Sequence, residues 1–195
     1  MMMGPASAKD FVSKYLEKDL PSRLVAYRNH WNLSEEELPL PNTYLTYAPP
    51  SLEYMTDELP ALYTVIISTK SMTRIGYTET MDPIYTVVYD ARTYVWVRDE
   101  GMDATARARD NLITVMRTSM LDEQCLLDAD TENREVKFDE GTMIEEFSDL
   151  LPQKGQRWAA GGYLSYEMTI NEIVTRPLIG TVTDFEITNY RFLED

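Results

Sequence analysis

The alternation of hydrophobic and polar residues is most regular over residues 84–98, which are predicted to form one long strand. One face of this strand would carry Tyr85, Val87, Tyr89, Thr93, Val95 and Val97. The other face would carry Ile84, Val88, Tyr94 and Trp96. Its fifteen residues would extend roughly 50 Å, whereas an ordinary strand has about 5–6 residues. A bulge at residues 90–92 is expected to bend the strand, and part of it is expected to project beyond the rest of the domain.

Three other segments also have strand patterns. Residues 61–69 are mostly apolar, which is typical of a strand buried on both faces, and a loop containing Gly76 is expected to follow. Residues 163–171 alternate cleanly, and four of their side chains are expected to point inward: Leu164, Tyr166, Met168 and Ile170. A last strand is predicted over residues 181–192, and residues 134–138 (REVKF) are a candidate for a short one.

The N-terminal part of the chain has helical spacing. Residues 7–20 place one apolar stripe on a helix, formed by Phe11, Val12, Tyr15, Leu16 and Leu20. Pro21 is expected to end this helix, because proline lacks the backbone N–H and normally stops a helix. A second short helical piece is predicted over residues 22–31.

A longer helix is predicted over residues 103–121, with Asp103 as its N-cap. Its apolar face would carry Ala108, Leu112, Val115, Met116 and Ser119. Its opposite face would carry Arg107, Asp110, Thr114 and Arg117. Further on, residues 142–152 are predicted to form a short amphipathic helix ended by Pro152, with Ile144, Phe147, Leu150 and Leu151 on one side. Residues 155–162 are predicted to be a loop.

These elements predict a single α+β domain over residues 1–195. The expected architecture is a mostly antiparallel sheet of four to five strands, with a long helix packed on one face. The parts in chain order are an N-terminal helical part (7–31), a proline-rich arm (32–60), a core of two strands and a helix (61–121), an acidic insertion (122–160) and C-terminal strands (161–195).

The composition supports a folded chain and excludes several kinds of site. Hydrophobic residues make up 44% of the sequence and aromatic residues 11%, which argues against disorder. Cys125 is the single cysteine and His30 the single histidine, so neither an internal disulfide nor a four-ligand zinc site is expected. No apolar run is long enough to span a bilayer, and no secretory signal is visible at the start.

The net charge of −15 speaks against wrapping nucleic acid, because such binding depends on Lys and Arg side chains that neutralise phosphates. Candidate catalytic and metal-binding patterns are weak. Residues 128–139 have oxygen ligands at some calcium-loop positions, but Asn133 stands where the sharp turn needs glycine. Gly161–Gly162 is too short for a phosphate-binding loop, and no nucleotide-binding or hydrolase motif occurs. No catalytic, cofactor-binding or metal-binding residue is therefore predicted.

The segments LPALYTVIIST (59–69) and YTVVYDARTYVWVRDEGMDATARARDNLITVMRTSML (85–121) resemble the tail terminator proteins of long-tailed bacteriophages, which are also called tail completion or neck proteins. The shared feature is a strand, here ending in Val95–Trp96–Val97, followed by a short acidic or glycine turn, here Asp99–Glu100–Gly101. A helix in which arginines alternate with small residues then follows, here Arg107 and Arg109 among alanines. The proline-rich arm and the acidic insertion depart from the shortest members of that family.

The resemblance implies a structural virion protein that forms a homohexameric ring. The ring would cap the growing tail tube, stop its polymerisation and join the tail to the head, with DNA passing through the lumen without sequence-specific binding. Its partners would be further copies of this chain, the tail tube protein and a head-completion (stopper) protein, with no membrane and no cofactor. It would be found in the virion at the head–tail junction, and in the host cytoplasm during assembly.

On this interpretation the end of the long strand and the arginine face of the helix are the candidate subunit contacts: Tyr94, Trp96, Arg98, Asp99, Arg107, Arg109 and Arg117. A simple solvated helix face is the alternative interpretation of the arginines. Other function classes also stay open. The chain could be a head-completion or stopper protein of the same neck, a cytoplasmic α+β protein that binds a small ligand or peptide, or an enzyme that uses paired carboxylates.

Overall fold

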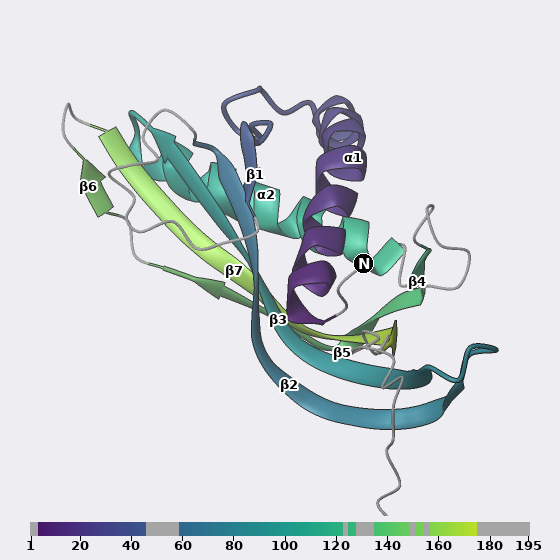
Figure 1. Cartoon of the computed structure of the whole chain (residues 1–195). Coiled ribbons are helices and arrows are strands. Elements are labelled where there is room, and N and C mark those ends of the chain that lie inside the picture. The colour runs from purple at the N-terminus through teal and green to yellow at the C-terminus, as the bar shows by residue number, and fades with distance from the viewer. Residues whose placement is uncertain are drawn as a thin grey trace, which may run out of the picture.

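The computed structural model describes residues 4–45, 59–122, 125–127, 135–148, 151–153 and 157–174. Within these residues the chain has an α+β fold, in which two helices lie on the same side of a mixed sheet (Figure 1). The helices are α1 (Pro5–Trp31) and α2 (Met102–Asp122). The strands are β1 (Thr43–Leu45), β2 (Ala61–Tyr77), β3 (Pro83–Asp99), β4 (Cys125–Leu127), β5 (Glu135–Phe147), β6 (Leu151–Gln153) and β7 (Arg157–Ile173).

Among the described residues the sheet has seven strands, in the order β1-β2-β3-β7-β5-β4, and β6 also pairs with β7. All pairs are antiparallel except β1 with β2, which is parallel. The sheet is therefore larger than the four to five strands expected. The additional strands β1, β4 and β6 have three residues each, and such short segments show no alternation that a sequence pattern could reveal.

The long strand predicted over residues 84–98 is confirmed as β3, but it does not project alone. It pairs with β2 on one side and with β7 on the other along nearly its whole length. The bulge expected at residues 90–92 was wrong, because the irregular positions lie on β2, where the register skips Ile67, Lys70 and Ile75. β2 also continues through Gly76 to Tyr77 in place of the expected loop. In Figure 1, β2 and β3 curve together beneath the N-terminal end of α1.

The core lies between the sheet and the helices, and its sequence pattern was predicted correctly. The side chains of β3 alternate between buried and half-buried positions, with Val87, Tyr89, Val95 and Val97 buried. The four inward positions of β7 and the apolar face of α2 are buried as expected. A buried polar chain crosses three strands, in which the hydroxyls of Thr64 and Thr93 lie 3.0 Å apart and those of Thr93 and Tyr166 also 3.0 Å apart.

The N-terminal region forms one continuous helix, so the predicted break at Pro21 was wrong. Pro21 cannot donate to the carbonyl of Glu17, but Glu17 is exposed, so water can bind that carbonyl. Leu20 and Leu24 are fully buried on either side of the proline. Burial of these side chains outweighs the local cost of proline, because tertiary packing commonly overrides intrinsic propensity. Asn32 ends the helix in the left-handed conformation.

Three further sequence predictions differ from the structure. Asp103 lies in the first turn of α2, which begins at Met102, so it is not the N-cap. Residues 142–147 belong to β5, not to a helix, and β7 begins at Arg157 where a loop was expected. In β5, Ile144 pairs with Ser165 and Phe147 pairs with Gly162, so the two apolar side chains point to opposite faces of a strand. Spacing of three residues fits one face of a helix equally well, which explains the error.

Several predicted segments lie outside the described residues. These are the strand expected at residues 181–192, part of the proline-rich arm (46–58), and residues 128–134 of the candidate calcium loop.

A polar network joins α1 to α2. Asp19 accepts hydrogen bonds from Arg23 Nε, from Tyr15 OH (3.3 Å) and from Ser119 Oγ (2.9 Å). Arg23 also donates to Asp122 at the end of α2. One carboxylate of α1 therefore binds groups from both helices.

We expect Asp19→Asn to lower the free energy of unfolding by about 1–2 kcal/mol, because the ion pair with Arg23 is lost and the remaining donors meet a neutral acceptor. Denaturant unfolding of the full chain measures this change. Glu17→Gln, an exposed change on the same helix, should leave the midpoint unchanged. Equal losses in the two variants would contradict the role of the network.

Candidate assembly surfaces

The side of the sheet opposite the helices has a row of aromatic side chains, which we call the aromatic surface: Tyr63, Tyr94, Trp96 and Tyr163. The row exists because Tyr63, Tyr94 and Tyr163 are direct partners across β2, β3 and β7. The ring centroids of Tyr63 and Tyr94 lie 4.7 Å apart and the rings are nearly parallel, and those of Tyr94 and Tyr163 lie 5.0 Å apart. Aromatic pairs at this separation stabilise a sheet beyond the area that they bury.

Charged groups border this surface. The Arg92 guanidinium lies 4.8 Å from the centre of the Tyr163 ring, within the range of a cation–π interaction. A hydrogen bond with Glu146 raises the pKa of Tyr163, because it favours the protonated phenol beside a carboxylate. Burial raises the pKa of Tyr63. Both phenols therefore remain neutral donors at ordinary pH.

Two consecutive glycines connect the aromatic surface with the helix side of the sheet. A Cβ atom on Gly161 would lie 2.7 Å from atoms of the Trp96 ring, so the indole lies directly over this glycine. A Cβ atom on Gly162 would point to the other face, 2.6 Å from Ile113 Cδ1 and 2.8 Å from the Glu146 carbonyl oxygen. Successive residues of a strand face opposite ways, so the pair allows close approach on both faces. Gly161 therefore makes room for the Trp96 ring, and Gly162 makes room for Ile113 and the Glu146 carbonyl.

The three candidate arginines of α2 have different environments. Arg109 is buried, with 9% of its surface exposed. It donates to the Ser148 carbonyl (2.6 Å) and to Asp110 (2.8 Å), and its guanidinium lies 5.0 Å from the Phe147 ring centre. These contacts fix the end of β5 within the same chain, and the role of Arg109 as a subunit contact stays a prediction. Arg117 is half-buried and pairs with Glu145 of β5 at 3.1 Å. Arg107 is exposed.

The remaining candidates lie near the end of β3. Trp96, Tyr94 and Arg98 alternate with buried residues and point to the aromatic surface. Asp99 is the last residue of β3 and accepts the backbone N–H of Glu100 at 2.6 Å. The structure thus divides the six other candidates between two sides of the sheet. The aromatic residues and Arg98 lie on one side, and the arginines of α2 lie on the other.

The sequence interpretation missed a second group of exposed side chains. They lie on the outer part of β2, the turn after it, and β5: Ile67, Met72, Ile75, Tyr77, Met81, Ile144 and Phe147. These residues are apolar and strand-like in sequence, so pattern alone would place them in the core. Ile144 points to the side opposite the helices, and the outer residues of β2 lie at the edge of the described sheet. Clustered exposed apolar residues commonly mark an interaction surface.

A row of carboxylates crosses the same side as the aromatic surface. Asp90 of β3 pairs with Glu167 of β7, which pairs with Asp139 of β5. Like charges directly opposite one another destabilise a sheet. Lys70 Nζ lies 3.5 Å from Glu167 and partly offsets this repulsion. Arg92 and Lys137 also point to this side, so positive charges border the carboxylate row.

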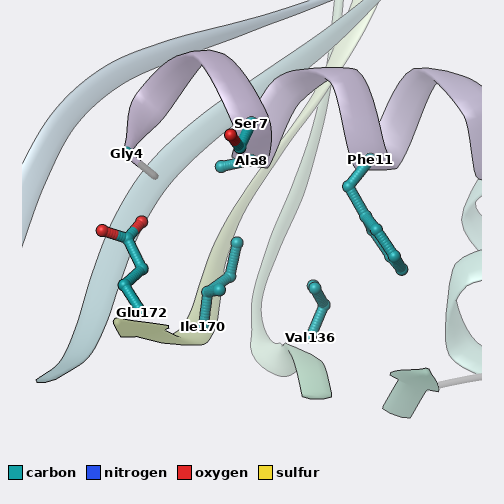
Figure 2. Close-up of a pocket in the computed structure, with 7 residues that line it drawn as sticks. All are labelled: Gly4, Ser7, Ala8, Phe11, Val136, Ile170 and Glu172. Carbon is teal, nitrogen blue, oxygen red and sulfur yellow. The ribbon is translucent and has the colours of Figure 1, made fainter. Parts of the chain in front are cut away.

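A small pocket of about 20 Å³ lies under the first turns of α1. Figure 2 shows Glu172, Ile170 and Val136 pointing from the sheet toward α1, and Phe11 pointing from α1 toward the sheet. Glu172 is buried and accepts a hydrogen bond from Tyr89 OH at 2.6 Å. Burial and this bond raise the pKa of Tyr89. The pocket holds about one water molecule, so it offers no room for a substrate.

Among the described residues no three His, Cys, Asp or Glu side chains are grouped so as to hold a metal ion. No helix in the described part of the chain is both long and apolar enough to cross a membrane. The sequence matches no protein-family model, and no curated protein is significantly similar to it.

Proposed function

We propose that this chain is a ring-forming virion protein, which caps the tail tube of a long-tailed bacteriophage and joins the tail to the head. The proposal starts from the resemblance of residues 59–121 to tail terminator proteins. The resemblance implies an α+β subunit, and the described residues have an α+β fold.

The main support for the proposal is that exposed apolar residues lie on different parts of the subunit. A ring is built from heterologous contacts, in which each subunit uses two different surfaces to meet its two neighbours. The exposed apolar residues of outer β2 and those of β5 lie on different sides of β3 and β7 in the strand order, so the subunit offers two such surfaces. The pocket under α1 gives no support to a ligand-binding function, because it has room for about one water.

The acidic charge fits a passage for DNA. The chain has a net charge of −15, and Asp90, Glu167 and Asp139 form an acidic row on the side opposite the helices. If this side lines the lumen, its carboxylates repel the DNA phosphates and let DNA slide without binding. A basic or neutral lumen in the assembled ring would contradict this part of the proposal.

Assembly tests the function directly. We expect negative-stain images of the purified protein, alone or mixed with tail tube protein, to show closed rings, and the mass in solution to be a multiple of the 22.5 kDa chain. Tube lengths should fall when the protein is added during tube polymerisation. Arg107→Glu should reduce ring formation with an unchanged melting temperature, since Arg107 is exposed.

The phenotype of a phage that lacks the protein separates the two neck functions. Abnormally long tails would support a terminator, whereas filled heads that lose DNA would support a stopper. A protein that never forms rings and never changes tube length would contradict both.

A further inference from the structure

The outer half of β2 is a free edge of the described sheet. β1 pairs with β2 only at Ala61, Leu62 and Tyr63, and no other described strand pairs on that side. Residues 67–75 are all exposed. Such an edge presents backbone N–H and C=O groups that can pair with a strand of another chain.

Bulges divide this edge into short regular runs. The register of β2 against β3 skips Ile67, Lys70 and Ile75, and each bulge interrupts the regular ladder. Residues 71–74 are the longest uninterrupted run in the exposed half, and we call them the β2 edge. Bulges of this kind limit indiscriminate pairing, so a partner strand must match a run of about four residues.

A matching run lies at the other side of the sheet. β4 pairs with β5 only over Glu135, Val136 and Lys137, and the register of β5 against β7 breaks between Asp139 and Ile144. Residues 144–147 are regular again and have no strand on their outer side within the described chain. We call these residues the β5 edge.

The two edges are complementary in charge. Residues 67–77 of β2 contain Lys70 and Arg74 and no acidic residue. Residues 138–147 of β5 contain only acidic charges, at Asp139, Glu140, Glu145 and Glu146. In a chain with a net charge of −15, the outer half of β2 therefore carries only positive charges. Opposite charges across an interface favour this pairing and disfavour β2 with β2 or β5 with β5.

Both edges also expose apolar side chains beside their charges. Met72 on the β2 edge is 52% exposed, and Ile144 and Phe147 on the β5 edge are 59% and 49% exposed. Side chains of this size lose water when strands pair, which adds stability to the backbone hydrogen bonds.

The strand directions allow the edges to meet. β2, β3, β7 and β5 alternate in direction across the sheet. When a second copy lies beside the first in the same orientation, its β2 therefore runs antiparallel to β5 of the first. A rotation axis roughly parallel to the strands preserves this relation from copy to copy and closes a ring.

We propose that the β2 edge of one copy pairs with the β5 edge of the next, so that one antiparallel sheet continues from subunit to subunit. The inference rests on the proposed ring and identifies the segments that join its neighbours. The contact is heterologous, and each copy uses both of its free edges once.

Cysteine cross-linking between two single variants tests the pairing. Thr73 and Ile144 both point to the side of the aromatic surface, as their partners Thr86 and Ser165 show. A protein with Ser71→Cys or Thr73→Cys is mixed with a protein with Ile144→Cys or Glu146→Cys and oxidised. These four mixtures cover three neighbouring antiparallel registers. We expect a disulfide-linked dimer in at least one mixture, because paired strands bring Cβ atoms within disulfide range.

The controls define what would overturn the proposal. The unchanged chain measures the background from Cys125, its single cysteine. Met72→Cys mixed with Ile144→Cys should give no dimer, since Met72 pairs with Val87 and points to the helix side. A dimer formed by a Thr73→Cys protein alone would indicate symmetric β2–β2 pairing. That result, or no cross-link in all four mixtures, overturns the proposal.

Charge reversal gives an independent readout. Arg74→Glu should weaken association of the copies by about tenfold or more, and adding Glu145→Arg, which lies on the same helix side of the sheet as Arg74, should restore it. Arg74 is exposed, so circular dichroism should show that the single variant is still folded. Loss of association that the second change does not restore would contradict the charge pairing.

The outcomes separate this inference from the proposed function. If the protein forms rings that shorten tail tubes but gives no cross-link, the proposed function is supported and the edge pairing is contradicted. If the copies cross-link but do not change tube length, the edge pairing is supported and the tail-capping function is contradicted.

Discussion

Replacing Arg109 by alanine is expected to lower the free energy of unfolding by about 2–3 kcal/mol, through lost charge-assisted hydrogen bonds and lost packing of the side-chain stem. The guanidinium of Arg109 donates to the Ser148 carbonyl and lies over the Phe147 ring, and both partners belong to the end of β5 and the residue after it. Ser148 in turn hydrogen bonds to Gly161 of β7 through its backbone and its hydroxyl. Without Arg109 this corner of the sheet loses its link to α2.

Arg107→Ala is the matched control, two residues earlier on the same helix. Because Arg107 is exposed, its removal should change the free energy of unfolding by no more than about 0.5 kcal/mol. Denaturant unfolding measures both variants under one set of conditions. If Arg109→Ala were as stable as Arg107→Ala and lost only its ability to form rings, Arg109 would be a subunit contact after all.

This pair of arginines shows where sequence reasoning about the site stops. Arg107 and Arg109 lie in the same run of alternating arginines and small residues, and nothing in the run distinguishes them. The difference comes from Phe147 and Ser148, far along the chain, which β5 brings against Arg109 alone. A contact of that sequence separation depends on the pairing of β5 with β7, which no local pattern specifies.

The fold was predictable where one face of an element is buried along its whole length. β3, β7 and α2 meet this condition, and their burial follows the alternation or helical spacing of the sequence. β2 and β5 have outer residues that are mostly exposed on both faces, so these residues show no pattern to read. Their bulges and free edges became visible only with the register against β3 and β7. Most of the residues in the proposed edge pairing therefore lay outside the candidates found from sequence.

Gly161 and Gly162 lie so close to neighbouring atoms that a larger side chain at residue 162 is expected to destabilise the fold. Gly162→Ala should lower the free energy of unfolding by about 1–3 kcal/mol, the usual cost of overpacking a core. The new methyl group would lie 2.8 Å from the Glu146 carbonyl oxygen, and this backbone atom cannot move without disturbing the pairing of β5 with β7. Ile113 Cδ1, at 2.6 Å, would also have to shift within the core. Thermal unfolding should show the change, since each kcal/mol lowers Tm by about 2–4 °C for a chain of this size.

Gly76→Ala provides the matched control in the same sheet. A Cβ atom at Gly76 would meet no atom within 4 Å, and its φ does not lie in the left-handed region, so alanine fits there without strain. This variant should be unchanged or slightly more stable, by about 0.4–1 kcal/mol, because alanine restricts the unfolded chain. Gly161→Ala should fall between the two, since the half-buried Trp96 ring can rotate away from a new methyl group whereas the Glu146 carbonyl cannot. Equal Tm values for the variants at 76 and 162 would show that α2 does not pack on β7 at the distance described, and the link from Arg109 to the end of β5 would fail with it.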